Sequence, residues 1–283
     1  LFRSSAASDV YKRQVIGSAL TRSRGMEYGE IVSMPETERA IRTALQSAQK
    51  LANSRVDHVI ACISGGSPRS YGLEGTVDIK TGIVDDNDIA DVLGSCGIPA
   101  YGSDREVLHA QPVNFSLDHR TGLSDPRGQI GKKLSVDMHM LTVKEKTIHD
   151  LAYCLKRCDL ELAGVASASY ASALSSLVED EKELGAACID LGGGSTNLAI
   201  FWKKHMIFAE TIKMGGGLVT RDISLGLQIP LPTAERLKTR NGGVVATGLD
   251  DREMIEIASE TEDWEGERRM ISRSDLILSL IHI

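Results

Sequence analysis

The segment from residue 188 to residue 201 carries the clearest chemical content of the sequence. An apolar stretch ends in Asp190, a glycine turn follows, and Ser195 and Thr196 precede a second apolar stretch. The glycines of the turn are Gly192, Gly193 and Gly194. Because glycine lacks a Cβ atom, such a turn brings backbone close to a ligand and can adopt positive φ. Successive N–H groups can hold phosphate oxygens, and Asp190 is placed to hold Mg²⁺ through water.

Two familiar phosphate motifs are absent from the sequence. No G-x-x-x-x-G-K-[ST] stretch occurs, and no G-x-G-x-x-G stretch leads from a strand into a helix. The turn at residues 192–194 leads instead into another strand. A glycine-rich hairpin without a ligand therefore stays open as the alternative to a phosphate site.

Alternating strands and helices are expected to position this turn, which indicates an α/β architecture. Strands are expected at residues 56–64, 75–80, 105–117, 133–143, 160–166, 186–191, 196–202 and 206–213. Helices are expected at residues 33–52, 85–93, 144–158, 168–177, 218–225 and 233–239. The first helix carries a start at Ser33 that resembles a capping box, and the strand at 56–64 has an apolar run typical of burial on both faces. Residues 179–183 are expected to be a solvated loop, and the sequence past Arg240 is polar and weakly patterned. Asp85, Asp86 and Asp88 are expected to cap the helix at 85–93, with a contact surface as the alternative. The strand at 133–143 alternates between apolar and polar residues.

Composition excludes several classes of protein. The 283 residues carry a net charge of −7, which disfavours a general nucleic-acid binder. No apolar run approaches the roughly 18 residues that a membrane-spanning helix needs. The five cysteines form no C-x-x-C pair, which favours buried free thiols in a reducing cytoplasm. The histidines have no metal-site spacing.

The two ends of the sequence, residues 1–14 and 278–283, look foreign. Neither has a hydrophobic period, the last six residues have no cap, and both resemble in-frame translations of sequencing-library adaptors. We therefore expect the natural protein to continue beyond both ends. A natural disordered head and a short apolar tail are the alternative.

Residues 190–200, D-L-G-G-G-S-T-N-L-A-I, resemble the second phosphate motif of the actin-like ATPases. Within that superfamily, further segments resemble the FtsA family of bacterial cell-division proteins, in an order and spacing that match over about residues 15–277. These segments are residues 23–25, 63–65, 125–128 with Gly131, 167–169, 179–185, 214–216, 219–223 and 234–238.

The resemblance implies an actin-like (ribonuclease H-like) ATPase fold of the α/β class with an inserted α+β subdomain. It divides the chain into 15–66 (part of subdomain 1A), 67–146 (the inserted subdomain 1C), 147–184 (return to 1A), 185–235 (subdomain 2A) and 236–277 (start of 2B). Residues 1–14 and 278–283 belong to none of these subdomains and are interpreted as artefacts.

The resemblance also implies a site for ATP and Mg²⁺ in the full-length protein. Asp190 would face Mg²⁺, and Gly192, Gly193, Gly194, Ser195 and Thr196 would cradle the β- and γ-phosphates. Gly215, Gly216 and Gly217 would approach the sugar-phosphate side, and Glu235 and Lys238 would face the ribose and base. For Gly215 to Gly217, a plain strand-to-helix turn stays open as the alternative. For Glu235 and Lys238, the alternative is a solvated pair on one helix. The family's first phosphate loop, its adenine-side glycine motif and its C-terminal amphipathic helix are not found, so we expect this chain alone to bind ATP poorly. No catalytic residue is assigned.

The implied function is that of an ATP-binding cell-division protein at the cytoplasmic face of the bacterial inner membrane, at the division septum. It would form filaments, link the tubulin-like FtsZ ring to the membrane and recruit later divisome proteins, as a scaffold with weak or no ATPase turnover. A phosphotransferase or ATP-hydrolysing enzyme of the same superfold, such as a sugar kinase, is the alternative, although no candidate for a catalytic Asp is found beyond Asp190. An ATPase of the kind used in pilus assembly is a further alternative.

Overall fold

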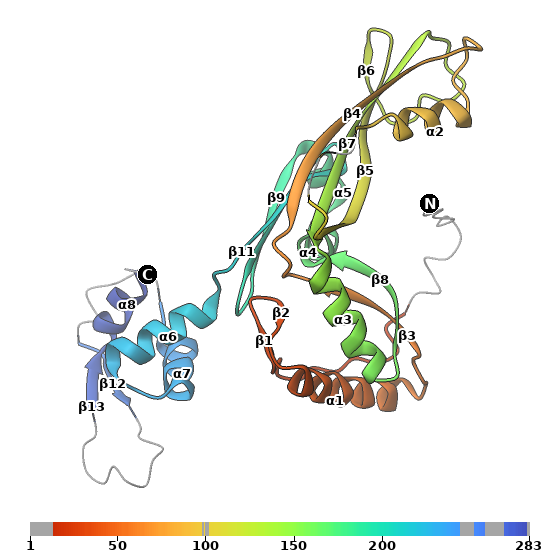
Figure 1. Cartoon of the computed structure of the whole chain (residues 1–283). Coiled ribbons are helices and arrows are strands. Elements are labelled where there is room, and N and C mark those ends of the chain that lie inside the picture. Colours follow the sequence, from red (N-terminus) through yellow and green to blue (C-terminus); the bar gives the residue numbers. More distant parts are fainter. Residues whose placement is uncertain (1–13, 98, 100–101, 244–251, 258–268, 282–283) are drawn as a thin grey trace. The chain divides into compact units, whose positions relative to one another are not determined.

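The structure is a computed structural model that describes residues 14–97, 99, 102–243, 252–257 and 269–281. The chain divides into two compact units (Figure 1). The first comprises Leu1–Asp190 with Asn197–Thr211, and the second comprises Leu191–Thr196 with Ile212–Ile283. The subdomain boundaries implied by the resemblance stay predictions.

The first unit begins with a small hairpin, β1 (Met26–Glu27) and β2 (Glu30–Ile31), followed by helix α1 (Met34–Ala52). The expected capping box is wrong, because the Ser33 side chain makes no cap hydrogen bond. The buried Thr37 hydroxyl, one turn into the helix, donates instead to the carbonyl oxygens of Ser33 and Gly25, each at 3.0 Å.

Two parallel strands, β3 (His58–Ile63) and β8 (Glu161–Ser167), pack with α1 and α3 (Glu145–Arg157). The expectation that residues 56–64 are buried on both faces is wrong, since Ile60 is 74% exposed. Among the described residues the core forms on one face of this pair, where Val59 and Ala61 pack against the helices. The apolar run therefore alternates between half-buried and exposed positions.

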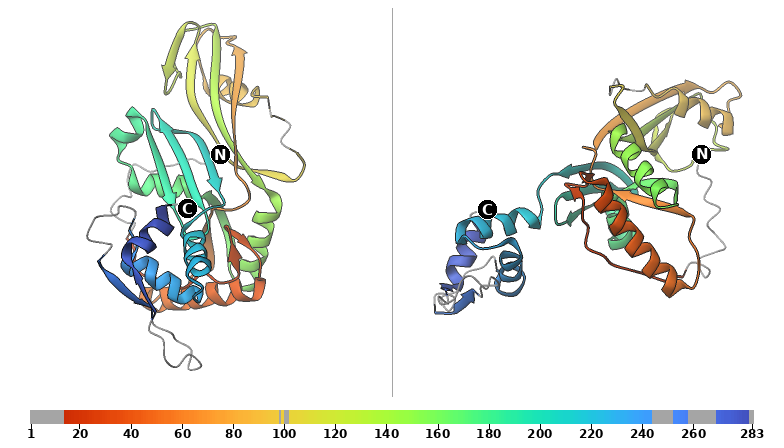
Figure 2. Two further views of the ribbon diagram at one scale, coloured as in Figure 1. Left: turned by 90° about the vertical axis from the view of Figure 1, so that its left-hand side faces the viewer. Right: turned by 60° about the horizontal axis from the view of Figure 1, so that its bottom comes forward.

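A four-stranded antiparallel sheet lies between residues 69 and 144, in the order β4-β7-β5-β6. Its strands are β4 (Arg69–Asp78), β5 (Arg105–Leu117), β6 (Arg120–Leu123) and β7 (Lys133–Lys144). Helix α2 (Asp86–Gly94) covers one face (Figures 1 and 2) and encloses a core of its own with the sheet. Asp85 begins α2 with a capping box to Asp88, which confirms the expected helix cap.

Strand β7 passes from one core to another. Its first half alternates as predicted, with Leu134 and Val136 buried and Asp137 exposed. From His139 to Val143 every residue is buried, because this half also packs toward the next sheet, where Leu141 joins a second core with Phe201.

That next sheet contains β9 (Ala186–Leu191), β10 (Thr196–Trp202) and β11 (His205–Ile212), in the order β11-β10-β9. Helix α4 (Ala168–Ser176) packs against its core through Ala173. Residues 179–183, expected to be a solvated loop, belong to helix α5 (Glu179–Leu184), in which Lys182 is only 8% exposed. A run of charged residues can form a helix where one member covers apolar surface with its methylenes.

Among the free cysteines, Cys62 is exposed, so the expectation of buried thiols is wrong for this residue.

The second unit contains three helices and a strand pair among its described residues. They are α6 (Gly216–Leu227), α7 (Leu231–Asn241), α8 (Arg273–Ile281) and the antiparallel pair β12 (Met254–Ile257) and β13 (Arg269–Ser272). Their core includes Ile223, Leu237, Ile255 and Leu276. The elements past Arg240 were not predicted individually, because short strands within polar sequence carry too few residues to show a period.

Helix α8 extends into the last six residues, and the expectation that these residues are an artefact stays a prediction. The helix continues to Ile281, and the Ser272 hydroxyl caps it by accepting the Asp275 N–H at 3.1 Å. Residues 1–13 and 282–283 lie outside the described residues, so the expectation for the first end stays untested.

Candidate functional site

The two glycine segments lie together in the second unit. The Gly216 N–H, at the start of α6, donates to the Gly192 carbonyl at 3.0 Å, and the Gly217 N–H donates to the Gly193 carbonyl at 2.7 Å. The first turn of α6 is thereby fixed against the turn that precedes β10. Two segments 24 residues apart in the chain form one backbone structure.

The glycines are needed here for close backbone approach. A Cβ on Gly215 would lie 2.5 Å from the Gly192 oxygen, and one on Gly217 would lie 2.9 Å from the Gly193 oxygen. Positive φ, which the sequence had suggested, is not the reason, because the described glycines with positive φ lie elsewhere in the chain. A side chain at Gly215 would therefore push the two segments apart.

Three successive N–H groups of the turn remain available as hydrogen-bond donors. Gly192 donates its N–H to the Ser195 carbonyl at 2.9 Å, but within the described residues the N–H groups of Gly193, Gly194 and Ser195 have no hydrogen-bond partner. A Cβ on Gly193 would meet no atom within 4 Å, so there is space at this point of the turn.

The two hydroxyls of the motif are placed differently from each other. Ser195 is buried, at 6% exposure, whereas Thr196 is half-buried and donates its hydroxyl to the Met214 carbonyl at 2.7 Å. That bond fixes the start of β10 to the residue just before the second glycine segment. Thr196 therefore has a structural partner, and its expected phosphate contact stays a prediction.

Lys238 connects α7 to the start of α6. Its Nζ donates to the Gly216 carbonyl at 3.0 Å and to the Thr220 hydroxyl at 2.7 Å, and it forms an ion pair with Glu235 at 2.7 Å. The Lys238 side chain is only 21% exposed, so the pair with Glu235 is not merely a solvated helical pair. Thr220 was missed by the sequence analysis, because an uncharged residue four positions after a glycine carries no distinctive signal.

Asp190 lies in the first unit and belongs to a polar network. Its Oδ2 accepts hydrogen bonds from the Ser172 hydroxyl at 3.0 Å and from the Asn197 Nδ2 at 3.4 Å. The buried Asn197 in turn accepts from the Thr211 hydroxyl at 2.8 Å. Both bonds reach Oδ2, and in the described part of the chain none reaches Oδ1. Asn197 could have been suspected as a polar residue within an apolar strand, whereas Ser172 and Thr211 gave no sequence signal.

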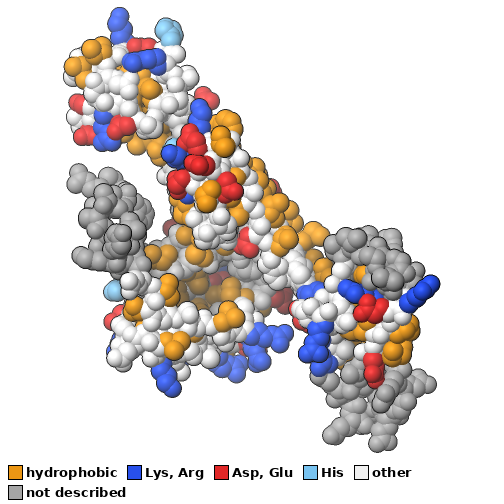
Figure 3. Space-filling model, turned by 180° about the vertical axis from the view of Figure 1, so that it is seen from behind, with side chains coloured by type: hydrophobic (Ala, Val, Ile, Leu, Met, Phe, Trp, Pro, Cys, Tyr) orange, Lys and Arg blue, Asp and Glu red, His pale blue; other side chains and the backbone are white. Residues whose placement is uncertain are grey.

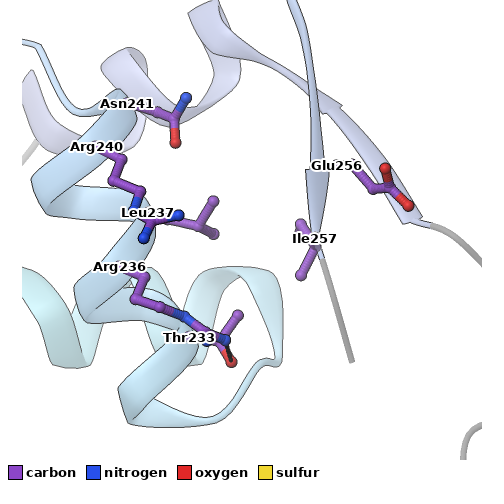
Figure 4. A pocket seen from close by; sticks show the side chains of 7 residues that line it. All are labelled: Thr233, Arg236, Leu237, Arg240, Asn241, Glu256 and Ile257. Atoms are coloured by element: carbon purple, nitrogen blue, oxygen red, sulfur yellow. Dashed lines mark hydrogen bonds between the residues drawn. The ribbon is translucent and has the colours of Figure 1, made fainter. Parts of the chain in front are cut away.

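A cavity of about 170 Å³ is lined by residues of α7 and β12 (Figure 4), and Lys238 is not among them. Leu237 and Ile257 point toward each other between α7 and β12, and Arg236 and Arg240 follow one another along the helix. This cavity shares no residue with the glycine site.

The described residues contain no group of three His, Cys, Asp or Glu side chains arranged to hold a metal ion. None of their helices is both long and apolar enough to cross a membrane.

Comparison with known proteins identifies the family. The family model described as "SHS2 domain inserted in FTSA" matches residues 65–142, and "Cell division protein FtsA" matches residues 187–277. Together they match more than half of the chain. The first range coincides closely with the sheet β4-β7-β5-β6 and helix α2.

Curated relatives agree with the family models. The chain is 36% identical over 250 residues to cell division protein FtsA of Rhizobium meliloti (strain 1021), covering 88% of this chain and 57% of the relative. It is 32% identical over 246 residues to that of Pseudomonas aeruginosa, covering 87% and 59%. The chain thus spans less than two thirds of the length of the curated relatives it matches.

A solved structure supports the fold. The "PilM-PilN type IV pilus biogenesis complex" superimposes with a TM-score of 0.54 at 14% sequence identity, covering 78% of this chain and 60% of that one. Together with the family matches, this confirms the expected fold class. The chain therefore belongs to the FtsA family of cell-division proteins and has the actin-like ATPase fold with an inserted SHS2 domain.

Proposed function

We propose that this chain provides the phosphate-binding part of the ATP site of an actin-like cell-division protein. The observation that carries the proposal is the row of three N–H groups at Gly193, Gly194 and Ser195, which have no partner among the described residues. Consecutive backbone N–H groups are the donors that phosphate-binding turns use. The open space at Gly193 leaves room for a phosphate group, so the residues present fit one.

Lys238 supports the same assignment. Its ammonium group lies 3.5 Å from the position of a Cβ on Gly216, over the first turn of α6. A mostly buried cation beside a helix N-terminus raises the local potential for an anion. Thr220 and Glu235 hold this ammonium group in place, so a nucleotide would meet a preorganised charge.

Asp190 is proposed as the carboxylate for Mg²⁺. It precedes Gly192 by two residues, and its Oδ2 is already held by Ser172 and Asn197, which leaves Oδ1 for a water molecule of the ion's shell. Mg²⁺ binds oxygen ligands and keeps several of its waters, so one fixed carboxylate is sufficient. The bound ion would neutralise part of the charge of the phosphates.

The role of the whole protein is proposed from its family. We expect it to act at the division septum, to form filaments, to link the FtsZ ring to the cytoplasmic membrane and to recruit later divisome proteins. Relatives named as cell division proteins support this role. ATP would act mainly as a conformational ligand of the whole protein.

The nucleotide site is tested by calorimetric titration of the chain with Mg·ATP. Replacing Lys238 by Gln should weaken binding at least tenfold, since hydrogen bonds to charged groups contribute about 1.5–3 kcal/mol. The matched control is Arg240→Gln, which removes a cation from the opposite face of the same helix and should leave the affinity unchanged. The unaltered chain is expected to bind weakly, and equal affinities of Lys238→Gln and the unaltered chain would contradict the proposal.

The metal is tested with Asp190→Asn, which keeps the hydrogen bond from Ser172. We expect this variant to bind ATP equally with Mg²⁺ or with EDTA, whereas the unaltered chain should bind more tightly with Mg²⁺. Partner binding is tested separately by co-sedimentation with FtsZ polymers. The test uses the full-length protein, and its absence from the pellet would contradict the proposed FtsZ link.

A further inference from the structure

A basic pocket of about 310 Å³ lies beside the first half of α1, in the first unit. Arg22 and Arg24 approach it from the segment before β1, and Arg39 approaches it from the helix. Figure 3 shows Lys and Arg side chains gathered at the lower edge of the first unit, where α1 lies. The pocket shares no residue with the glycine site.

The segment that carries Arg24 is fixed to the helix by its backbone. The Gly25 carbonyl accepts from the N–H groups of Val32 and Ser33, at 2.9 and 3.0 Å, and from the buried Thr37 hydroxyl at 3.0 Å. Gly25 has a φ of 75°, and a Cβ there would lie 2.4 Å from the Ser33 oxygen. Residues 23–25, which resemble an FtsA segment, therefore form a close backbone contact that holds the pocket wall.

The three arginines have no acidic partner in the described part of the chain. Arg22 and Arg24 form no ion pair, and Arg39 donates only its Nε, to the Pro35 carbonyl at 3.3 Å. Arg42, one turn along the helix, differs: it pairs with Glu38 at 3.5 Å and with Asp159 at 3.2 Å.

Glu36 is the single carboxylate that lines the pocket, so the lining carries an excess of two positive charges. This excess occurs in a chain whose net charge is −7. Like charges held together without counter-charges repel one another, and an anion would relieve this repulsion.

We propose that this pocket binds a phosphate group, presented by a small phosphorylated molecule or by an anionic lipid headgroup. Guanidinium groups bind phosphate oxygens in a bidentate manner, which explains arginine rather than lysine at all three positions. Thr21 also lines the pocket, and its hydroxyl can donate to a phosphate oxygen, whereas the Thr43 hydroxyl donates to the Arg39 carbonyl at 2.8 Å. Its volume lies at the lower end of the roughly 300–1,000 Å³ of small-molecule sites.

The first arm of the test titrates the whole chain with inorganic pyrophosphate in the presence of EDTA. The double variant Arg24→Gln/Arg39→Gln should lose at least tenfold in affinity for one binding site. Its matched control is Arg55→Gln, which removes an arginine that is 80% exposed and lies beyond the end of α1. Pyrophosphate bound at the glycine site is recognised by its loss in the variant Lys238→Gln. This variant should not alter the binding that depends on Arg24 and Arg39.

The second arm measures co-flotation with phosphatidylglycerol vesicles, with phosphatidylcholine vesicles as the neutral comparison. Flotation that requires Arg24 and Arg39, together with weak pyrophosphate binding, identifies a lipid headgroup as the source. Pyrophosphate binding without flotation identifies a soluble ligand. The proposal is overturned if the double variant and Arg55→Gln behave alike in both arms. Because the guanidinium groups are exposed, circular dichroism should show both variants folded.

Discussion

The buried His139 should make the stability of the first unit depend on pH. This side chain on β7 is 3% exposed, and its Nε2 lies 3.0 Å from the Ser70 hydroxyl oxygen. Ser70 donates its hydroxyl to the Ala209 carbonyl and accepts the Ala209 N–H, each at 2.9 Å. The Ser70 hydroxyl has a single hydrogen, so His139 must donate through Nε2. Its buried Nδ1 then has no partner among the described residues.

Protonation of this ring would place a charge and an N–H group where nothing described accepts them. Burial, together with the charge of the nearby His109, lowers the pKa of His139 from its ordinary 6.5 to about 4. At a pH between about 4 and 6.5, His139 binds a proton in the unfolded chain but not in the folded chain. The free energy of unfolding therefore falls as the pH falls, and from pH 7 to pH 4.5 the loss is about 2–3 kcal/mol.

The assay is urea unfolding of the chain, followed by circular dichroism at several pH values. In the variant His139→Gln, the amide Nε2 can still donate to Ser70, but the titrating group is gone. Between pH 7 and pH 4.5, the free energy of unfolding of this variant should fall by about 2–3 kcal/mol less than that of the unaltered chain.

The control for this assay is His149→Gln, because the His149 side chain is 68% exposed. It should keep the pH dependence of the unaltered chain. An identical pH dependence in His139→Gln and the unaltered chain would refute the reasoning, because it would mean that His139 titrates alike in both states.

Three further changes have outcomes that follow from the structure. Gly215→Ala places a Cβ 2.5 Å from the Gly192 oxygen, so it should lower the melting temperature of the chain and weaken Mg·ATP binding, measured by calorimetry. Asp85→Ala removes the cap of α2 and its bond with the Asp88 N–H, and should cost about 0.5–2 kcal/mol in urea unfolding. Ser70→Ala leaves the Ala209 N–H and carbonyl without the bridging hydroxyl, and should cost about 1–3 kcal/mol in the same assay.

Local patterns in the sequence were sufficient for many of the elements. The strands expected at 105–117, 186–191 and 196–202 have the bounds that the structure shows. The cap at Asp85 was also predictable, since a carboxylate before a helix bonds N–H groups only two and three residues away. Family membership and the actin-like fold were accessible for a similar reason, because the motifs that carry them are contiguous.

Burial was less predictable than the position of the strands. The apolar run of β3 predicted two covered faces, but Ile60 is exposed. The sequence of β7 alternates between apolar and polar residues, but the second half of the strand is buried throughout, from His139 to Val143. The reason is that burial depends on which elements pack on a strand, and those elements come from distant parts of the chain.

The sequence by itself determined that a glycine turn follows Asp190 and that a second glycine segment follows the strand β11. Only the tertiary structure decided that these glycines serve backbone approach, with Gly216 and Gly217 donating to the carbonyls of the earlier turn. It also decided that Lys238 reaches the Gly216 carbonyl. The contacts between the two glycine segments join residues 24 positions apart through backbone atoms, and the Lys238 side chain also ends on a backbone carbonyl; every residue type carries these backbone groups. No side-chain pattern in the sequence can therefore record them.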